Sequence, residues 1–144
     1  MGCDFAIVIA DRNRHVREFL KREFMLLGYR VQIAKDGWEV IAMAKCGGPC
    51  DLLILDPEVP FAEGPDIVTQ LRNRQPALPV IIHTFAEYAG NPAVQGAAGL
   101  VEKRGDIEQL KRVVAEILQK WYPQRFSSIE EDYIPRTENN QTAR

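Results

Sequence analysis

Short apolar runs alternate with longer amphipathic segments along the chain, and this alternation predicts the strands of a parallel sheet separated by helices. Most of the runs are continuous Ile, Val and Leu, as expected for strands buried on both faces. The segment YRVQIA alternates apolar and polar residues instead, which indicates an edge strand. The predicted strands are Phe5–Ala10, Tyr29–Ala34, Leu52–Leu55, Val80–His83 and Gly99–Glu102.

Apolar residues at helical spacing predict the helices between these strands. The first helix ends at Gly28, a good C-terminal cap, and the third has Pro65 in its first turn and Pro76 beyond its end. In the segment EYAGNPAVQGA, Gly90 and Pro92 interrupt the pattern, so we expect a short or broken fourth element there. The clear helices are expected over residues 16–27, Trp38–Cys46, Pro65–Arg74 and Ile107–Trp121.

The last part of the chain is polar and has too few apolar residues to build a second core. We therefore expect one folded domain over residues 1–122 and a disordered tail over residues 123–144. Apolar residues among the acids of this tail either fold on a partner or belong to a spacer in which they are incidental. They are Phe126, Ile129, Tyr133 and Ile134.

Composition supports one compact domain, because 144 residues with 46% hydrophobic content bury a sizeable core. The 18 basic and 20 acidic side chains are scattered, so the sequence predicts no nucleic-acid partner. The run Phe5–Ala10 is too short to span a bilayer, so no membrane attachment is expected. Cys3, Cys46 and Cys50 are irregularly spaced, which makes zinc improbable and indicates free thiols in the cytoplasm.

Polar residues follow the predicted strands, and in an open parallel sheet this edge is where ligands bind. Asp11 follows the first strand, Asp56 the third, Thr84 the fourth and Lys103 the fifth. Loops are polar in general, so each residue alone is uninformative. The four together predict a shared pocket, in which two neighbouring carboxylates need a cation from Lys103 or from a metal.

The order Asp11, then LDPEVP, then HTF, then VEKRGD resembles the receiver domain of bacterial two-component response regulators. The resemblance covers about Asp4 to Tyr122. It implies an α/β fold with a doubly wound, five-stranded parallel sheet in the flavodoxin-like order 2-1-3-4-5. It also implies a signalling module in a phosphorelay and not an enzyme.

In the resembling family, a sensor histidine kinase, a phosphotransfer protein or a small donor gives a phosphoryl group to an aspartate, which here is Asp56. The resemblance implies that Mg²⁺ binds Asp11, Asp56 and the backbone carbonyl of Glu58. Lys103 would pair with the phosphoryl group, and Thr84 would hydrogen-bond it and switch a surface for a downstream protein partner.

The sequence departs from the family at the residue after Asp11, where a second acid usually binds the metal and this chain has Arg12. A guanidinium offers only donors, so we expect weak Mg²⁺ binding. Either Arg12 turns outward and leaves the other ligands in place, or it reaches Asp56 and stands where the cation would stand.

Three further positions are unusual and are expected to modulate the site. Phe85 replaces a small residue and should slow small phosphodonors and shelter an acyl phosphate. Arg104 replaces a proline after Lys103, so we expect a trans peptide bond and a shifted loop. Leu100 stands at the position of the aromatic switch residue, which weakens the usual output route through the fourth helix.

The leading interpretation is a stand-alone receiver that is either phosphorylated on Asp56 or acts as a phosphorylation-impaired pseudo-receiver through Arg12–Asp56 pairing. An aspartyl-phosphate hydrolase would use Glu58 as its acid/base, but its nucleophile normally ends the first strand. A flavin-binding domain needs a hydroxyl- or glycine-rich loop after the first strand, and DRNRH is not one.

Overall fold

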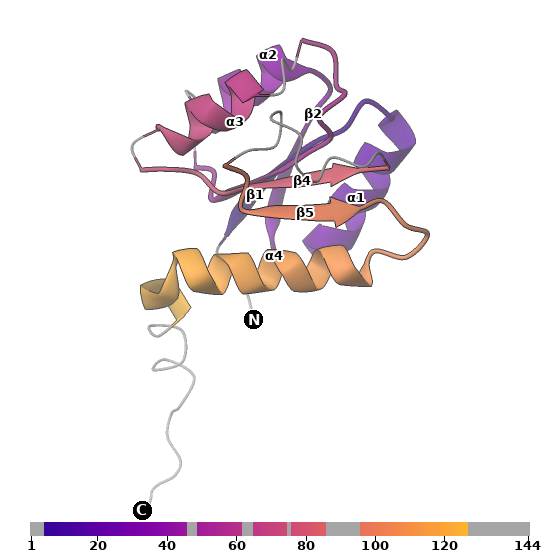
Figure 1. Ribbon diagram of the computed structural model, residues 1–144. Helices are drawn as coiled ribbons and strands as arrows, with labels where there is room; N and C mark the ends of the chain where they lie inside the picture. Colours follow the sequence, from indigo (N-terminus) through magenta and orange to yellow (C-terminus); the bar gives the residue numbers. More distant parts are fainter. Residues whose placement is uncertain (1–4, 46–48, 62–64, 75, 86–95, 127–144) are drawn as a thin grey trace, which may run out of the picture.

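The computed structural model describes residues 5–45, 49–61, 65–74, 76–85 and 96–126. One all-parallel sheet of five strands has the order β2-β1-β3-β4-β5, as predicted (Figure 1). β2 is an edge strand, and its side chains alternate between exposed and partly buried, as the segment YRVQIA indicated. The strands are β1 (Ala6–Ala10), β2 (Arg30–Ala34), β3 (Leu52–Leu55), β4 (Val80–Thr84) and β5 (Gly99–Glu102).

The helices are α1 (Arg14–Leu26), α2 (Gly37–Val40), α3 (Pro65–Arg72) and α4 (Glu108–Trp121). The Asn13 side chain caps α1, and Gly28 follows the helix at a φ of 97° that favours glycine. The predicted second helix is shorter than expected, because after Val40 it widens into a π-helical turn, η1 (Ile41–Lys45). Most of the expected fourth element, residues 87–95 of the segment 87–97, and the tail from residue 127 lie outside the described residues.

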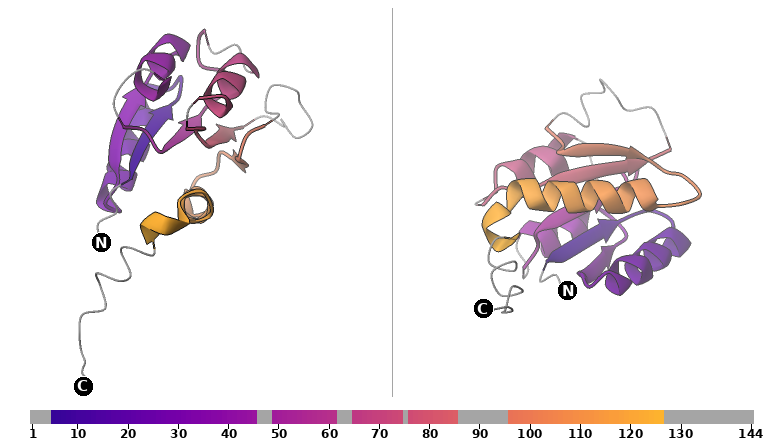
Figure 2. Two further views of the ribbon diagram at one scale, coloured as in Figure 1. Left: turned by 90° about the vertical axis from the view of Figure 1, so that its left-hand side faces the viewer. Right: turned by 90° about the horizontal axis from the view of Figure 1, so that it is seen from below.

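Helices cover both faces of the sheet (Figures 1 and 2), because successive strand residues point to opposite sides. Val8 and Leu53 pack with residues of α2, η1 and α3 on one face. Ile7 and Ile54 pack with residues of α1 and α4 on the other face. The two layers hold the carboxyl ends of the strands in a fixed arrangement at one edge of the sheet.

The folded domain extends beyond the predicted boundary at residue 122. Residues 123–126 are helical, and the Phe126 ring lies 5.5 Å from the Phe5 ring between centroids. The Arg125 guanidinium lies 4.1 Å from the centre of the Phe5 ring and forms an ion pair of 2.8 Å with Asp51. The expectation of disorder from residue 123 is therefore not met by these four residues, because they form a helix whose Arg125 and Phe126 contact the Phe5 ring.

Among the described residues, no helix is long and apolar enough to cross a bilayer. Cys50 is a free thiol, as expected, and it is buried. Burial raises the pKa of Cys50 to about 11, so it is a packing residue and not a reactive one. Cys3 and Cys46 lie outside the described part of the chain.

Candidate functional site

Three buried charged residues meet at the carboxyl edge of the sheet, and we call them the acidic pocket: Asp11, Asp56 and Lys103. Lys103 Nζ lies 2.8 Å from Asp11 Oδ2 and 3.4 Å from Asp56 Oδ2. The two carboxylates come from adjacent strands, and the Asp56 backbone N–H donates to the Ala10 carbonyl at 2.8 Å. The ammonium group therefore neutralises part of the charge of two carboxylates that water does not reach.

Backbone N–H groups orient both carboxylates. The Asn13 N–H donates to Asp11 Oδ1 at 2.8 Å, and the Glu58 N–H donates to Asp56 Oδ1 at 3.0 Å. These short turns follow directly from the strand ends, so the carboxylates are fixed by local chain geometry. Pro57 lacks an N–H, and Glu58 supplies the N–H that reaches Asp56 Oδ1.

Arg12 reaches Asp56, which is one of the two alternatives that the sequence left open. Its Nε lies 3.4 Å from Asp56 Oδ2, and its backbone N–H donates to the same oxygen at 3.3 Å. One guanidinium nitrogen also lies 2.7 Å from Glu58 Oε1. The sequence indicated backbone and acid/base roles for Glu58 but not this ion pair. The sequence carried one signal for this ion pair: an arginine beside the site needs a carboxylate partner nearby.

Thr84 and Phe85 border the acidic pocket from the end of β4. Thr84 is buried, and its backbone carbonyl accepts from the Lys103 N–H at 2.8 Å, which holds Lys103 beside β4. The exposed Phe85 ring lies with its centre 5.3 Å from Lys103 Nζ, a cation–π contact. Phe85 therefore covers one side of the acidic pocket.

His83 is a buried polar residue beside the site, and the sequence gave it no role. Within the described residues, its Nδ1 has no hydrogen-bond partner. Burial, together with the positive charge of Lys103, lowers the pKa of His83 to about 4, although Asp11 and Asp56 oppose this shift. The imidazole is therefore neutral at physiological pH.

A divalent metal does not fit this arrangement while Arg12 stays at Asp56. All four carboxylate oxygens of Asp11 and Asp56 have N–H or cationic partners. Among the described residues, no group of three or more His, Cys, Asp or Glu side chains is placed to hold a metal ion. Mg²⁺ requires near-octahedral oxygen ligands, and the Arg12 guanidinium is already a cationic neighbour of Asp56 Oδ2, at 3.4 Å.

The family model of the response regulator receiver domain matches residues 7–115, which include every residue of this site. The chain belongs to the response regulator receiver family. Receiver domains are signalling modules of two-component systems, and this supports the fold and the family that the sequence indicated.

Curated relatives match most of this chain along part of their own length. The response regulator MprA of Mycobacterium bovis is 29% identical over 92% of this chain and 62% of its own length. MprA of Mycobacterium avium is 30% identical over 82% of the chain and 53% of its own length. The chain thus spans about three fifths of the first of these relatives.

Solved structures show the same receiver fold. Response regulator TrrA of Thermotoga maritima in complex with Mg²⁺-BeF is 28% identical, with a TM-score of 0.73 over 79% of this chain and 99% of TrrA. TrrA in complex with the histidine kinase ThkA gives 28% identity and a TM-score of 0.72, over 79% of this chain and 98% of that one.

Two of the predicted modulators lie outside the acidic pocket of this receiver domain. Leu100 is an exposed residue of β5, so it does not form part of the buried site. Arg104 is also exposed and lies 3.6 Å from the Glu102 carboxylate. The trans peptide bond and shifted loop expected at Arg104 stay predictions.

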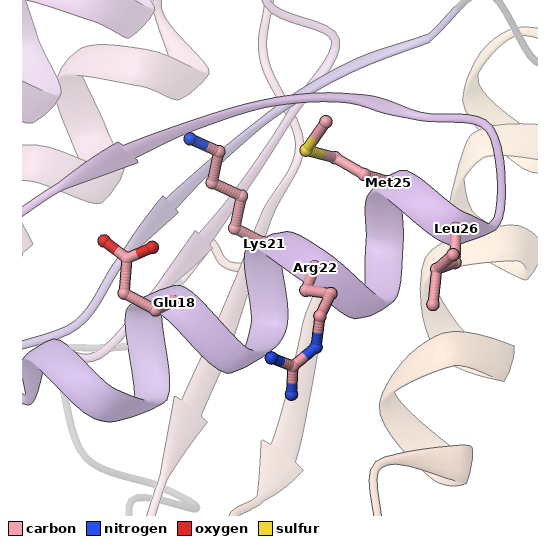
Figure 3. Close-up of a pocket in the computed structure, with 5 residues that line it drawn as sticks. All are labelled: Glu18, Lys21, Arg22, Met25 and Leu26. Atoms are coloured by element: carbon pink, nitrogen blue, oxygen red, sulfur yellow. The ribbon is translucent and has the colours of Figure 1, made fainter.

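A surface hollow of about 530 Å³ lies along α1 and is separate from the acidic pocket (Figure 3). Among the residues that the structure describes, those that line it come from this one helix, whereas the acidic pocket is built by the segments that follow β1, β3 and β5. The lining residues are Glu18, Lys21, Arg22, Met25 and Leu26.

Proposed function

We propose that this receiver domain accepts a phosphoryl group on Asp56, with Arg12 supplying part of the positive charge that a metal supplies elsewhere in the family. The observation that carries this proposal is the position of Asp56 Oδ2, which lies 3.4 Å from both Arg12 Nε and Lys103 Nζ. Two cations at one buried carboxylate can neutralise the charge of transferring phosphoryl oxygens.

The reaction needs an anionic nucleophile held in line with the donor. An Asp56 oxygen forms a bond to phosphorus while the bond from phosphorus to the donor nitrogen breaks, and that nitrogen takes a proton from water. Lys103 and Arg12 then pair with the phosphoryl oxygens, and the hydroxyl of Thr84, the last residue of β4, hydrogen-bonds one of them. Mg²⁺, when bound by Asp11, Asp56 and the Glu58 carbonyl, would add positive charge, but its binding is expected to be weak.

The proposed donor is a sensor histidine kinase or a phosphotransfer protein, because TrrA, with the same fold, has been solved in complex with a histidine kinase. The proposed output is a change in the surface that binds a downstream protein. Nucleic acid is not a proposed partner of this domain, because its charges are balanced and scattered. We also propose that the domain is located in the cytoplasm.

A second function is a pseudo-receiver that binds a partner without being phosphorylated. The observation in its favour is that the side chain of Asp56 is only 1% exposed and that Arg12 already pairs with it. An ion pair that satisfies the carboxylate lowers its reactivity as a nucleophile.

Phosphoryl transfer from phosphoramidate separates the two functions. The chain is incubated with the donor, with and without MgCl₂, and the adduct is located by mass spectrometry of its peptides. We expect slow modification of Asp56 that depends little on Mg²⁺, and none in Asp56→Asn. Arg12→Asp should react faster and should require Mg²⁺, whereas Arg112→Asp, which changes an exposed arginine of α4, should behave as wild type.

Modification of Arg12→Asp but not of the wild type would establish the pseudo-receiver. Modification of the wild type that requires Mg²⁺ as strongly as that of Arg12→Asp would contradict the proposed role of Arg12.

A further inference from the structure

We infer that Glu58 is a positioning residue, whose carboxylate holds the Arg12 guanidinium at Asp56 and thereby sets how readily the site admits a divalent cation; this inference rests on the proposed function. Arg12 makes its shorter contact with Glu58, at 2.7 Å, and its longer one with Asp56, at 3.4 Å. The location of the guanidinium is therefore defined mainly by Glu58.

The loop that carries Glu58 is fixed at both ends. The Glu58 N–H donates to Asp56 Oδ1, and the Val59 N–H donates to the Asp56 carbonyl at 3.2 Å. Further along, the Pro60 carbonyl accepts from the Gly37 N–H at 2.8 Å, which ties the loop to α2. The Glu58 carboxylate is thus presented from a constrained backbone.

Arg12 has a fixed backbone but a side chain with freedom to move. Its N–H is bonded to Asp56, and the next residue caps α1, whereas 46% of the side chain is exposed. A long side chain in this setting exchanges among rotamers unless a second partner holds it. Because an exposed ion pair is worth little, Glu58 should change the population of Arg12 at Asp56 by about two- to fivefold and not completely.

The Glu58 carboxylate acts on a divalent cation in two opposite ways. Its negative charge attracts the cation directly, so its loss should weaken metal binding. Through Arg12 it also keeps a competing positive charge at Asp56, so its loss should strengthen metal binding. The sign of the change in Mg²⁺ affinity separates a positioning role from simple attraction.

The first test uses the full chain without metal and follows the Arg12 Nε–H signal by NMR, assigned by its loss in Arg12→Lys. We expect Glu58→Gln and Glu58→Ala to raise the rate of solvent exchange of this proton by about two- to fivefold. Glu39→Gln is the matched control, because Glu39 pairs with Lys35 in an ion pair of the same 2.7 Å length and is similarly exposed. It should leave the Arg12 signal unchanged.

The second test measures Mg²⁺ affinity by calorimetry. Glu58→Gln should raise the affinity by about two- to fivefold when Arg12 is present. In an Arg12→Ala background the same change should not raise it. Unchanged Arg12 exchange in both Glu58 variants, or weaker Mg²⁺ binding from Glu58→Gln in both backgrounds, would overturn the inference. Neither readout requires phosphoryl transfer. The inference about Glu58 can therefore fail while phosphorylation of Asp56 is confirmed, and phosphorylation can fail while the inference about Glu58 is confirmed.

Discussion

Lys103 and Asp11 form the shorter ion pair of the acidic pocket, with 2.8 Å between Nζ and Oδ2. Both side chains are almost fully buried, so removal of the cation leaves Asp11 and Asp56 close together without water. We expect Lys103→Met to lower the free energy of unfolding by about 3 kcal/mol in urea titrations at neutral pH.

Lys111→Met is the matched control for this prediction. Lys111 also pairs with two carboxylates, those of Glu23 and Glu108, but its side chain is 22% exposed. Exposed pairs contribute little, so this change should cost less than about 1 kcal/mol. Equal losses in the two variants would show that burial adds nothing to the Lys103 interactions.

His83 should make the domain less stable as the pH falls. Its pKa is about 4 in the folded chain, below the ordinary 6.5, so the unfolded chain binds the proton first. The stability from the neutral imidazole is complete above about pH 6.5 and is lost progressively down to about pH 4. Between about pH 7 and about pH 5 the loss should reach about 2 kcal/mol. His83→Leu should remove this part of the pH dependence, and parallel stability curves for the two proteins would contradict it.

Phe61 occupies a backbone conformation that favours glycine, with a φ of 61°. Its exposed ring contacts Trp38 at 6.3 Å between centroids. Phe61→Gly loses that contact but relieves the backbone, whereas Phe61→Val keeps the strain in a β-branched residue. The valine variant should be at least about 1 kcal/mol less stable than the glycine variant in urea titrations. The same pair of changes at Phe85, which is equally exposed but has no positive φ, should not favour glycine.

Phe85 should limit the access of small phosphodonors, because its ring covers Lys103. Phe85→Ala should speed phosphorylation by phosphoramidate by about two- to fivefold, which corresponds to a contact of about 0.5 to 1 kcal/mol. The rate is measured by intact mass against time, with Phe61→Ala as a control for the loss of an exposed aromatic ring. A rate at or below that of the wild type would exclude a shielding role.

The sheet and the site edge could be predicted because strands buried on two faces appear in the sequence as continuous apolar runs. The run Leu52–Leu55 followed by Asp56 was enough to place a carboxylate at a strand end. Alternation in Arg30–Ala34 identified β2 as an edge. The π-helical turn Ile41–Lys45 could not be predicted, because its apolar spacing also fits an ordinary helix.

Contacts between side chains of different loops were harder to predict than the loops themselves. The sequence offered two orientations for Arg12, and spacing alone could not decide between them. The ion pair with Glu58 depends on how two turns are placed in space. His83 was overlooked because a single polar residue at a strand end also fits an ordinary loop boundary.

Two aspartates flank β3, and they mark opposite ends of the domain. Asp56 lies at the carboxyl end of the strand, whereas Asp51 precedes its first residue and binds Arg125 and the Ala6 N–H. A strand of this length separates them by roughly 15 Å. The helical turn over residues 123–126 therefore lies at the amino end of β3, remote from the Asp56 carboxylate. Mechanical coupling between Asp56 and this turn has to pass through the body of the sheet and the helices packed on it.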